Sequence, residues 1–210
     1  MGHGRAAATR YPGYHGSATD DRCAELVARA VIFTPTDIDG VIAVQLELHA
    51  DERGFFARTF CAREFGAAGL RPLVAQANIA FNERAGTLRG LHFQRPPAAE
   101  AKLVRCTRGR VYDVAVDLRP TSATYLRHVG VVLDADERNA LYVPEGCAHG
   151  YLTLEDGCEV AYQVSEFYSP GVEGGLHWND PALAIAWPGE VRVISDKDAT
   201  WPALDVTPGF

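Results

Sequence analysis

Two basic side chains and a histidine lie close together near the middle of the chain. His92 falls within Leu88–Gln94, and Lys102 and Arg105 follow in the next apolar segment. Both segments have the composition and alternation of β-strands. A histidine can act as a general base near neutral pH, and an ammonium group can stabilise a developing negative charge. The pattern indicates acid–base chemistry on a sheet, although a lone strand histidine is more often a satisfied core residue.

A second histidine is predicted to meet a tyrosine. His149 and Tyr162 lie on either side of Glu155-Asp156-Gly157, which is typical of a hairpin turn. Counting outward from that turn places His149 opposite Tyr162 or Gln163, and cross-strand neighbours are roughly 5 Å apart. The sequence therefore predicts that a histidine and a tyrosine share one patch.

The same counting places Lys102 near acidic side chains. The segments on either side of Arg108-Gly109 read as strands, and a hairpin there puts Lys102 opposite Ala115. Asp113 and Asp117 are then one alternation step away. Such a lysine forms either a structural ion pair or the cation of a polar site, and the counting alone leaves both roles open.

A metal centre is the main alternative use of the histidines. Gly86, His92 and His149 fit the glycine and histidine positions of the metal-binding cupin motif. Gln94 stands where that motif has its second histidine, and Glu100 comes a residue or two late. Because an amide is a poor ligand for metals that prefer imidazole, the motif predicts no catalytic metal. A metal-dependent dioxygenase that uses His92, Glu100 and His149 is the alternative function.

The elements that must hold these side chains are short strands separated by turn residues. This spacing predicts an all-β sandwich or barrel. A helical turn is expected over Ala62–Ala68, ended by Gly69. Residues 1–33 are expected to form an N-terminal tail or arm, and residues 34–210 a single domain. The expected strands cover 41–48, 55–60, 74–81, 88–94, 101–107, 110–118, 129–133, 150–154 and 158–164.

Composition excludes several classes of function. The 210 residues suffice for one domain with a core, and the net charge of -7 gives no basic footprint for nucleic acid. No apolar run is long enough to span a bilayer, and the first residues lack the apolar core of a signal peptide. The five cysteines are scattered without a CxxC pair, which favours reduced thiols in the cytoplasm.

Nine short motifs follow one another between Ile38 and Pro202. They lie at residues 51–56, 76–78, 88–94, 102–105, 113–119, 144–150, 168–170, 178–181 and 195–198. In this order they resemble the dTDP-4-dehydrorhamnose 3,5-epimerase family, whose members act on nucleotide sugars. The resemblance implies a cupin double-stranded β-helix (a jelly-roll barrel), no cofactor and no metal in catalysis.

The resemblance assigns catalytic roles that make chemical sense. A 4-keto sugar has acidified protons at C3 and C5, and inverting either carbon needs a base, an acid on the other face and a cation for the enolate. The resemblance implies His92 as the base, Tyr162 as the acid and Lys102 beside the ketone oxygen. It implies Asp198 as the carboxylate that orients His92, and the hairpin counting makes Asp113 a second candidate.

Substrate-binding roles also follow from the resemblance. Arginine suits a diphosphate because its planar fork pairs with two oxygens at once. One departure is Arg58, which stands where the family commonly has glutamate, and Gln163 replaces a common lysine. The implied substrate-binding residues are Arg53, Phe56, Gln76, Asn78, Arg89, Asp113, His149, Tyr168, Glu173 and Lys197.

The resemblance therefore implies a cytoplasmic isomerase that epimerises a dTDP-4-keto-6-deoxyhexose at C3, C5 or both, in deoxysugar biosynthesis. The acid–base residues do not distinguish a 3,5-epimerase from a C3-only epimerase. A sugar-binding barrel without catalysis is a third possibility, but binding alone needs no acid and base on opposite faces.

A homodimer with exchanged N-terminal strands is also expected. Val41–Leu48 alternates, and as an unpaired sheet edge it would be a liability that soluble proteins avoid. The resemblance implies that this segment pairs with the barrel of a partner subunit. Arg53 and Phe56 follow directly after it, so we expect them to complete the partner's pocket.

Overall fold

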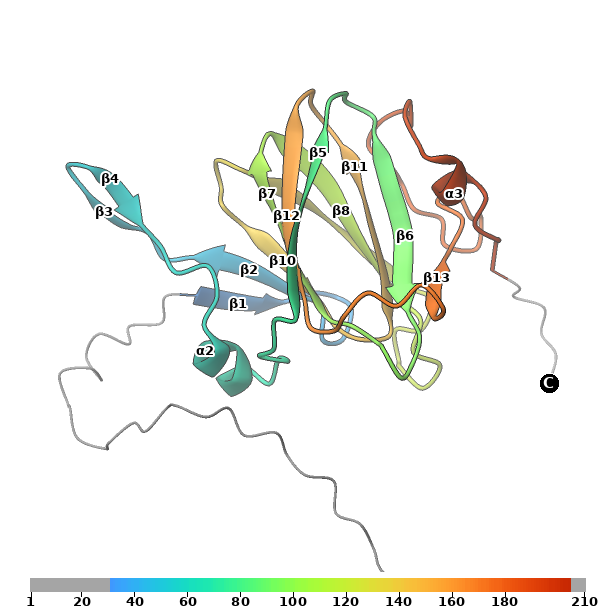
Figure 1. The fold of residues 1–210 in the computed structure, drawn as a ribbon, viewed down its shortest axis with the longest axis horizontal. Coiled ribbons are helices and arrows are strands. Elements are labelled where there is room, and N and C mark those ends of the chain that lie inside the picture. The colour runs from blue at the N-terminus through green and yellow to red at the C-terminus, as the bar shows by residue number, and fades with distance from the viewer. Residues whose placement is uncertain (1–30, 205–210) are drawn as a thin grey trace, which may run out of the picture.

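The computed structural model describes residues 31–204, and most of its elements are antiparallel strands in two main sheets (Figure 1). The first sheet has the order β1 (Val31–Pro35), β2 (Ile42–Leu46), β10 (Ala140–Val143), β7 (Lys102–Arg108), β12 (Cys158–Val164), β5 (Gln76–Asn82). The second sheet has the order β13 (Glu173–Gly175), β6 (Leu88–Gln94), β11 (Cys147–Thr153), β8 (Arg110–Asp117), β9 (His128–Asp134).

The smaller elements lie around this body. A two-stranded hairpin, β3 (His49–Asp51) with β4 (Gly54–Phe56), projects away from it (Figure 1). The predicted helical turn is confirmed as α2 (Ala62–Ala67), and α3 (Asp196–Ala199) lies beside β6. Among residues 31–204, no helix is both long enough and apolar enough to cross a membrane.

The inner faces of the two sheets form the core. Val104 and Leu141 from the first sheet pack in one cluster with Val111 and Ala115 from the second, and all four are fully buried. Strands with alternating apolar side chains bury one face each in this way. The arrangement confirms the predicted all-β barrel of the cupin type.

Both predicted hairpins are wrong. β11 pairs with β6 and β8, whereas β12 pairs with β5 and β7 in the other sheet. β7 and β8 also belong to opposite sheets. The turns at Gly109 and Gly157 therefore carry the chain across the barrel. Turn residues specify a tight reversal, but they do not specify whether the next strand pairs with the last one.

The true pairings change the neighbours of two site residues. His149 lies opposite Ala115 on β8 and opposite His92 on β6, so it is not a strand neighbour of Tyr162. Lys102 lies opposite Val164 on β12 and is not a strand neighbour of Ala115.

A bulge at Gly90 sets the faces of β6. His92 pairs with His149 and Arg89 with Tyr151, so β6 carries one residue more than β11 over this stretch. Gly90 has φ +128°, and a Cβ there would lie 2.5 Å from the Cα of Gly150, so only glycine fits. As a result Arg89 and His92 line the same cavity, which plain alternation would prevent.

The N-terminal strands differ from the expectation. β2 lies between β1 and β10 of its own barrel, so the expectation that Val41–Leu48 is an edge that needs the barrel of a partner subunit is wrong. β1 begins at Val31, three residues before the expected start of the domain at residue 34. Val31 is buried in a cluster with Phe65. The rest of the expected tail, residues 1–30, lies outside the described residues.

Candidate active site

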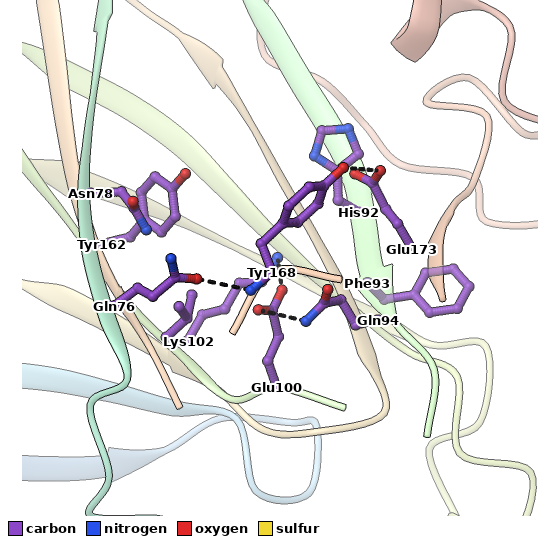
Figure 2. A pocket seen from close by; sticks show the side chains of 11 residues that line it. Gln76, Asn78, His92, Phe93, Gln94, Glu100, Lys102, Tyr162, Tyr168 and Glu173 are labelled. Atoms are coloured by element: carbon purple, nitrogen blue, oxygen red, sulfur yellow. Dashed lines mark hydrogen bonds and ion pairs between the residues drawn. The ribbon is translucent and has the colours of Figure 1, made fainter. Parts of the chain in front are cut away.

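Two adjoining cavities between the sheets collect most of the predicted site residues. Their volumes are about 350 Å³ and 170 Å³, and His92, Lys102 and Tyr162 line both of them. Figure 2 shows the larger cavity, with Tyr162 on one side and His92 on the other. Because the two cavities share these three residues, they form one cleft.

The predicted pair of His92 and Asp198 is present. His92 Nε2 lies 2.6 Å from Asp198 Oδ1, and Asp198 Oδ2 accepts a hydrogen bond of 3.2 Å from the backbone N–H of Gly90. Ser195 caps α3 and so fixes the position of Asp198. Burial raises the pKa of Asp198, but the bonds from His92 and Gly90 outweigh it, so the pKa lies below its usual value. The carboxylate engages Nε2, which leaves Nδ1 as the ring nitrogen that can accept a proton.

A second histidine–carboxylate pair lies beside the first. His149 Nε2 is 2.6 Å from Asp113 Oδ1, and Asp113 is fully buried beneath it. Asp113 is therefore neither a neighbour of Lys102 nor the partner of His92, and it does not reach the cavity. Those expectations followed from the wrong hairpin register. His149 itself lines the cleft together with Tyr162, as predicted, because the two side chains meet across the barrel.

Lys102 and Tyr162 supply a cation and a proton donor. The Lys102 ammonium lies 3.2 Å from Glu100 Oε1, and both side chains are only 11% exposed. Burial, and then the negative charge of Glu100, raise the pKa of Tyr162, while Arg89 acts in the opposite direction. Tyr162 is consequently protonated at neutral pH and can donate a proton from the sheet opposite His92.

Polar side chains surround the mouth of the cleft (Figure 2). The Tyr168 hydroxyl donates to Glu173 over 2.9 Å, and Lys197 Nζ lies 2.7 Å from both oxygens of the same carboxylate. Gln76 accepts a hydrogen bond of 2.8 Å from the backbone N–H of Tyr168, which ties β5 to the loop after β12. Gln76, Asn78, Tyr168 and Glu173 line the larger cavity, and Lys197 is joined to it through its ion pair with Glu173.

Arg89 is held by a residue that the sequence did not single out. Arg89 Nε donates to Asn82 Oδ1 over 2.8 Å, and buried Asn82 also contacts the Tyr151 hydroxyl at 3.3 Å. Tyr151 lines the cleft beside His149. Its position two residues after His149 on one strand was an available signal, because such residues share a face.

Besides Asp113, the predicted residues Arg53 and Phe56 lie outside the cleft of their own chain, as does Arg58. Arg53 and Phe56 are on the projecting β3–β4 hairpin, and Phe56 is 68% exposed. Arg58, the departure from the family pattern, forms an ion pair of 2.7 Å with Glu64 on α2. The Arg58 cation is thus neutralised away from the cavity.

The three donors of the alternative metal site do not converge. Glu100 binds Lys102, and His149 binds Asp113, so each donor has a different partner. Within the part of the chain that the structure describes, no three His, Cys, Asp or Glu side chains are grouped to hold a metal ion. The arrangement fits proton transfer better than metal coordination.

Sequence and fold both match one enzyme family. Its model, dTDP-4-dehydrorhamnose 3,5-epimerase, matches residues 35–205. The enzyme of that name from Methanothermobacter thermautotrophicus is 44% identical over 181 residues, which cover 85% of this chain and 97% of the relative. A dTDP-4-dehydrorhamnose 3-epimerase from Streptomyces niveus is 42% identical over 165 residues, which cover 78% of this chain and 79% of the relative.

A solved structure gives the same result. The dTDP-6-deoxy-D-glucose-3,5-epimerase of Legionella pneumophila, in complex with dTDP-4-keto-L-rhamnose, matches with a TM-score of 0.79 at 36% identity. The match covers 84% of this chain and 94% of that chain. The family model, the relatives and the shared fold together establish that this chain belongs to the dTDP-4-dehydrorhamnose 3,5-epimerase family and is an isomerase.

Proposed function

We propose that the protein epimerises a dTDP-4-keto-6-deoxyhexose at C3, C5 or both, as a step of deoxysugar biosynthesis. One observation carries this proposal. The His92–Asp198 pair and the protonated Tyr162 come from opposite sheets and line the same cleft, with the Lys102 ammonium also lining it. Inversion of a carbon next to a ketone needs a base, an acid and a cation in this relation.

In the proposed reaction His92 removes a proton from the carbon beside the ketone. The C–H electron pair moves to form the enolate, and its negative charge on oxygen is stabilised by Lys102. Tyr162 then donates its proton to the opposite face of the same carbon, which inverts it and regenerates the ketone. The imidazolium and tyrosinate that remain exchange protons with solvent. No oxidation state changes, so the reaction needs no redox cofactor.

The nucleotide end of the substrate fits the cleft mouth. Arg89 has no carboxylate partner among the described residues, so its guanidinium is available to a diphosphate. Tyr168 offers an exposed aromatic face for a base, and Gln76 and Asn78 offer amides beside it. Lys197, although paired with Glu173, adds a second cation on the same side.

A homodimer that exchanges the N-terminal β3–β4 hairpins would complete each site. β5 is the edge of the first sheet, and its Ile79 and Phe81 are 68% and 50% exposed, so this edge needs a cover. The projecting hairpin of a second copy has the length and aromatic residues to supply one. Arg53 of that hairpin would then bring a further cation to the diphosphate.

Mixing two inactive variants tests the shared site. Arg53→Ala and His92→Ala should each lower activity at limiting substrate. If sites are shared, equal mixing after subunit exchange restores activity in about a quarter of the sites, because half of the dimers are mixed and each has one intact site. If Arg53 acts in its own subunit, mixing restores nothing.

A cytoplasmic location fits the described cysteines, which are free thiols. Burial raises the pKa of the Cys106 and Cys147 thiols to about 12, which keeps them unreactive. The free cysteines are Cys61, Cys106, Cys147 and Cys158.

The decisive test of the reaction is incubation with a dTDP-4-keto-6-deoxyhexose in deuterated water, followed by proton NMR. Exchange at C3 and C5 with formation of both inverted centres supports a 3,5-epimerase. Exchange and inversion at C3 alone supports the second candidate, a 3-epimerase like the Streptomyces niveus relative. Unchanged substrate, with neither deuterium nor epimer, would refute the proposed function.

A further inference from the structure

Glu100 lies inside the cleft, but the proposed reaction gives it no task. Its side chain is 11% exposed and lines the larger cavity beside Lys102 and Tyr162 (Figure 2). One carboxylate oxygen lies 3.2 Å from Lys102 Nζ. The other accepts a hydrogen bond of 3.2 Å from Gln94 Nε2.

A buried amide fixes the Glu100 carboxylate in place. Gln94 is 4% exposed, and the backbone carbonyls of Ala98 and Phe167 share its two N–H groups with Glu100, at 3.0 and 3.2 Å from Nε2. Its Oε1 accepts a hydrogen bond of 2.6 Å from the backbone N–H of Ser169. Glu100 is therefore held against a rigid anchor, unlike a carboxylate in an exposed ion pair.

The charges of Glu100 and Lys102 depend on each other. Removing an ammonium from water is costly unless an opposite charge and hydrogen bonds compensate for it. Lys102 is equally buried, and Glu100 is the only carboxylate within ion-pair distance of it among the described residues. The contact with Glu100 is an ion pair, and the three Lys102 N–H groups can also bind the substrate.

We propose that Glu100 is a positioning residue for the epimerisation, because its carboxylate fixes the Lys102 ammonium where the ketone oxygen gains negative charge. This inference rests on the proposed function. The same carboxylate disfavours a second negative charge nearby, so it also helps to keep Tyr162 in the proton-donating form.

The test compares kcat, KM and the pH profile of wild type and Glu100→Gln on a dTDP-4-keto-6-deoxyhexose. We expect kcat to fall by about tenfold or more, since small misplacements of a catalytic group are costly, while KM does not rise. We also expect the alkaline limb of kcat to move to lower pH, because Tyr162 loses the negative neighbour that opposes its ionisation. The other charged or titratable groups in the two cavities around Tyr162 are unchanged by the substitution: Arg89, His92, Lys102, His149, Tyr151, Tyr168, Glu173 and Asp198.

Two further variants make the result specific. Glu190→Gln removes a carboxylate from an exposed ion pair with Arg192 outside the cleft, so it should leave kcat and the alkaline limb unchanged. Glu100→Asp keeps the charge but shortens the reach, so it should lower kcat and keep the wild-type alkaline limb. If Glu100→Gln does not fold, Glu100→Asp becomes the test, with the same expected fall in kcat and unchanged alkaline limb.

The outcomes separate the inference from the function beneath it. An inactive wild-type enzyme would overturn the proposed function itself. An active wild type with Glu100→Gln within twofold of it in kcat and with the same alkaline limb would overturn only the role of Glu100. A rise in KM with unchanged kcat would also overturn that role, because it would make Glu100 a substrate-binding residue.

Discussion

Replacing Asp198 with asparagine should slow proton abstraction without unfolding the site. The substitution keeps the size of the side chain and can still accept the backbone N–H of Gly90. It removes the negative charge that faces His92 across 2.6 Å. When His92 takes the proton from the sugar it becomes an imidazolium, and the lost carboxylate would have stabilised that cation.

The expected size follows from burial of the pair. The Asp198 side chain is only 6% exposed, so water screens the interaction little. Hydrogen bonds to charged groups contribute about 1.5–3 kcal/mol, and each 1.36 kcal/mol corresponds to a factor of ten in rate. We therefore expect the exchange rate to fall by about 10- to 150-fold.

The assay is the rate of deuterium incorporation into the sugar, measured by proton NMR at saturating substrate. Asp196→Asn is the matched control, because it removes an exposed carboxylate from the same short helix. Thermal unfolding of both variants should remain close to that of wild type. Asp198→Asn with exchange within threefold of wild type would refute the idea that the carboxylate assists His92, as would an equal loss in Asp196→Asn.

Three other predictions concern stability and binding. In a urea titration, Gly90→Ala should lower the free energy of unfolding by about 2 kcal/mol or more relative to Gly54→Ala. Both glycines have φ near +127°, but only at Gly90 would the added Cβ collide with the backbone of a neighbouring strand. Equal losses would contradict the close approach of β6 to β11. Burial raises the pKa of Asp117, but hydrogen bonds from Arg119 and neighbouring hydroxyls outweigh it and hold the pKa well below its usual range. The ionised Asp117 thus stabilises the fold above a pH of about 4, and this stabilisation is lost as pH falls further. Asp117→Asn should therefore lower the free energy of unfolding, measured in urea, more at pH 7 than at pH 3. A loss independent of pH would count against stabilisation by the Asp117–Arg119 pair. Asn82→Ala should raise KM more than it lowers kcat in steady-state kinetics, because Arg89 loses its anchor; an unchanged KM would show that Asn82 does not position it.

Most of the strands were predictable because alternation reports directly which face of a strand is buried, but β1, β3, β10 and β13 lie outside the expected strands. Their pairing was not, because the turns at Gly109 and Gly157 look the same whether the chain forms a hairpin or crosses to the other sheet. The wrong register placed Asp113 beside Lys102, whereas it lies beneath His149. A single-residue bulge at Gly90 then decides the face of Arg89, which strand alternation alone would have placed on the other side.

The site depended on a different kind of information. Asp198 lies more than a hundred residues after His92, and no local pattern connects them, so only the family resemblance brought them together. The Glu100–Lys102 pair had a local signal, because residues two positions apart on an extended segment share a face. The sequence reasoning considered Glu100 only as a possible metal ligand.

The most direct test of the account is the comparison of exchange with inversion in Tyr162→Phe and His92→Ala. Each variant is incubated with the 4-keto sugar nucleotide in deuterated water, and NMR measures both deuterium incorporation and the inverted product. We expect Tyr162→Phe to incorporate deuterium at a rate within about tenfold of wild type while forming at least about 100-fold less epimer. We expect His92→Ala to lose at least about 100-fold of both. Equal loss of exchange and inversion in Tyr162→Phe, or substantial exchange in His92→Ala, would contradict the assignment of base and acid to opposite sides of the cleft.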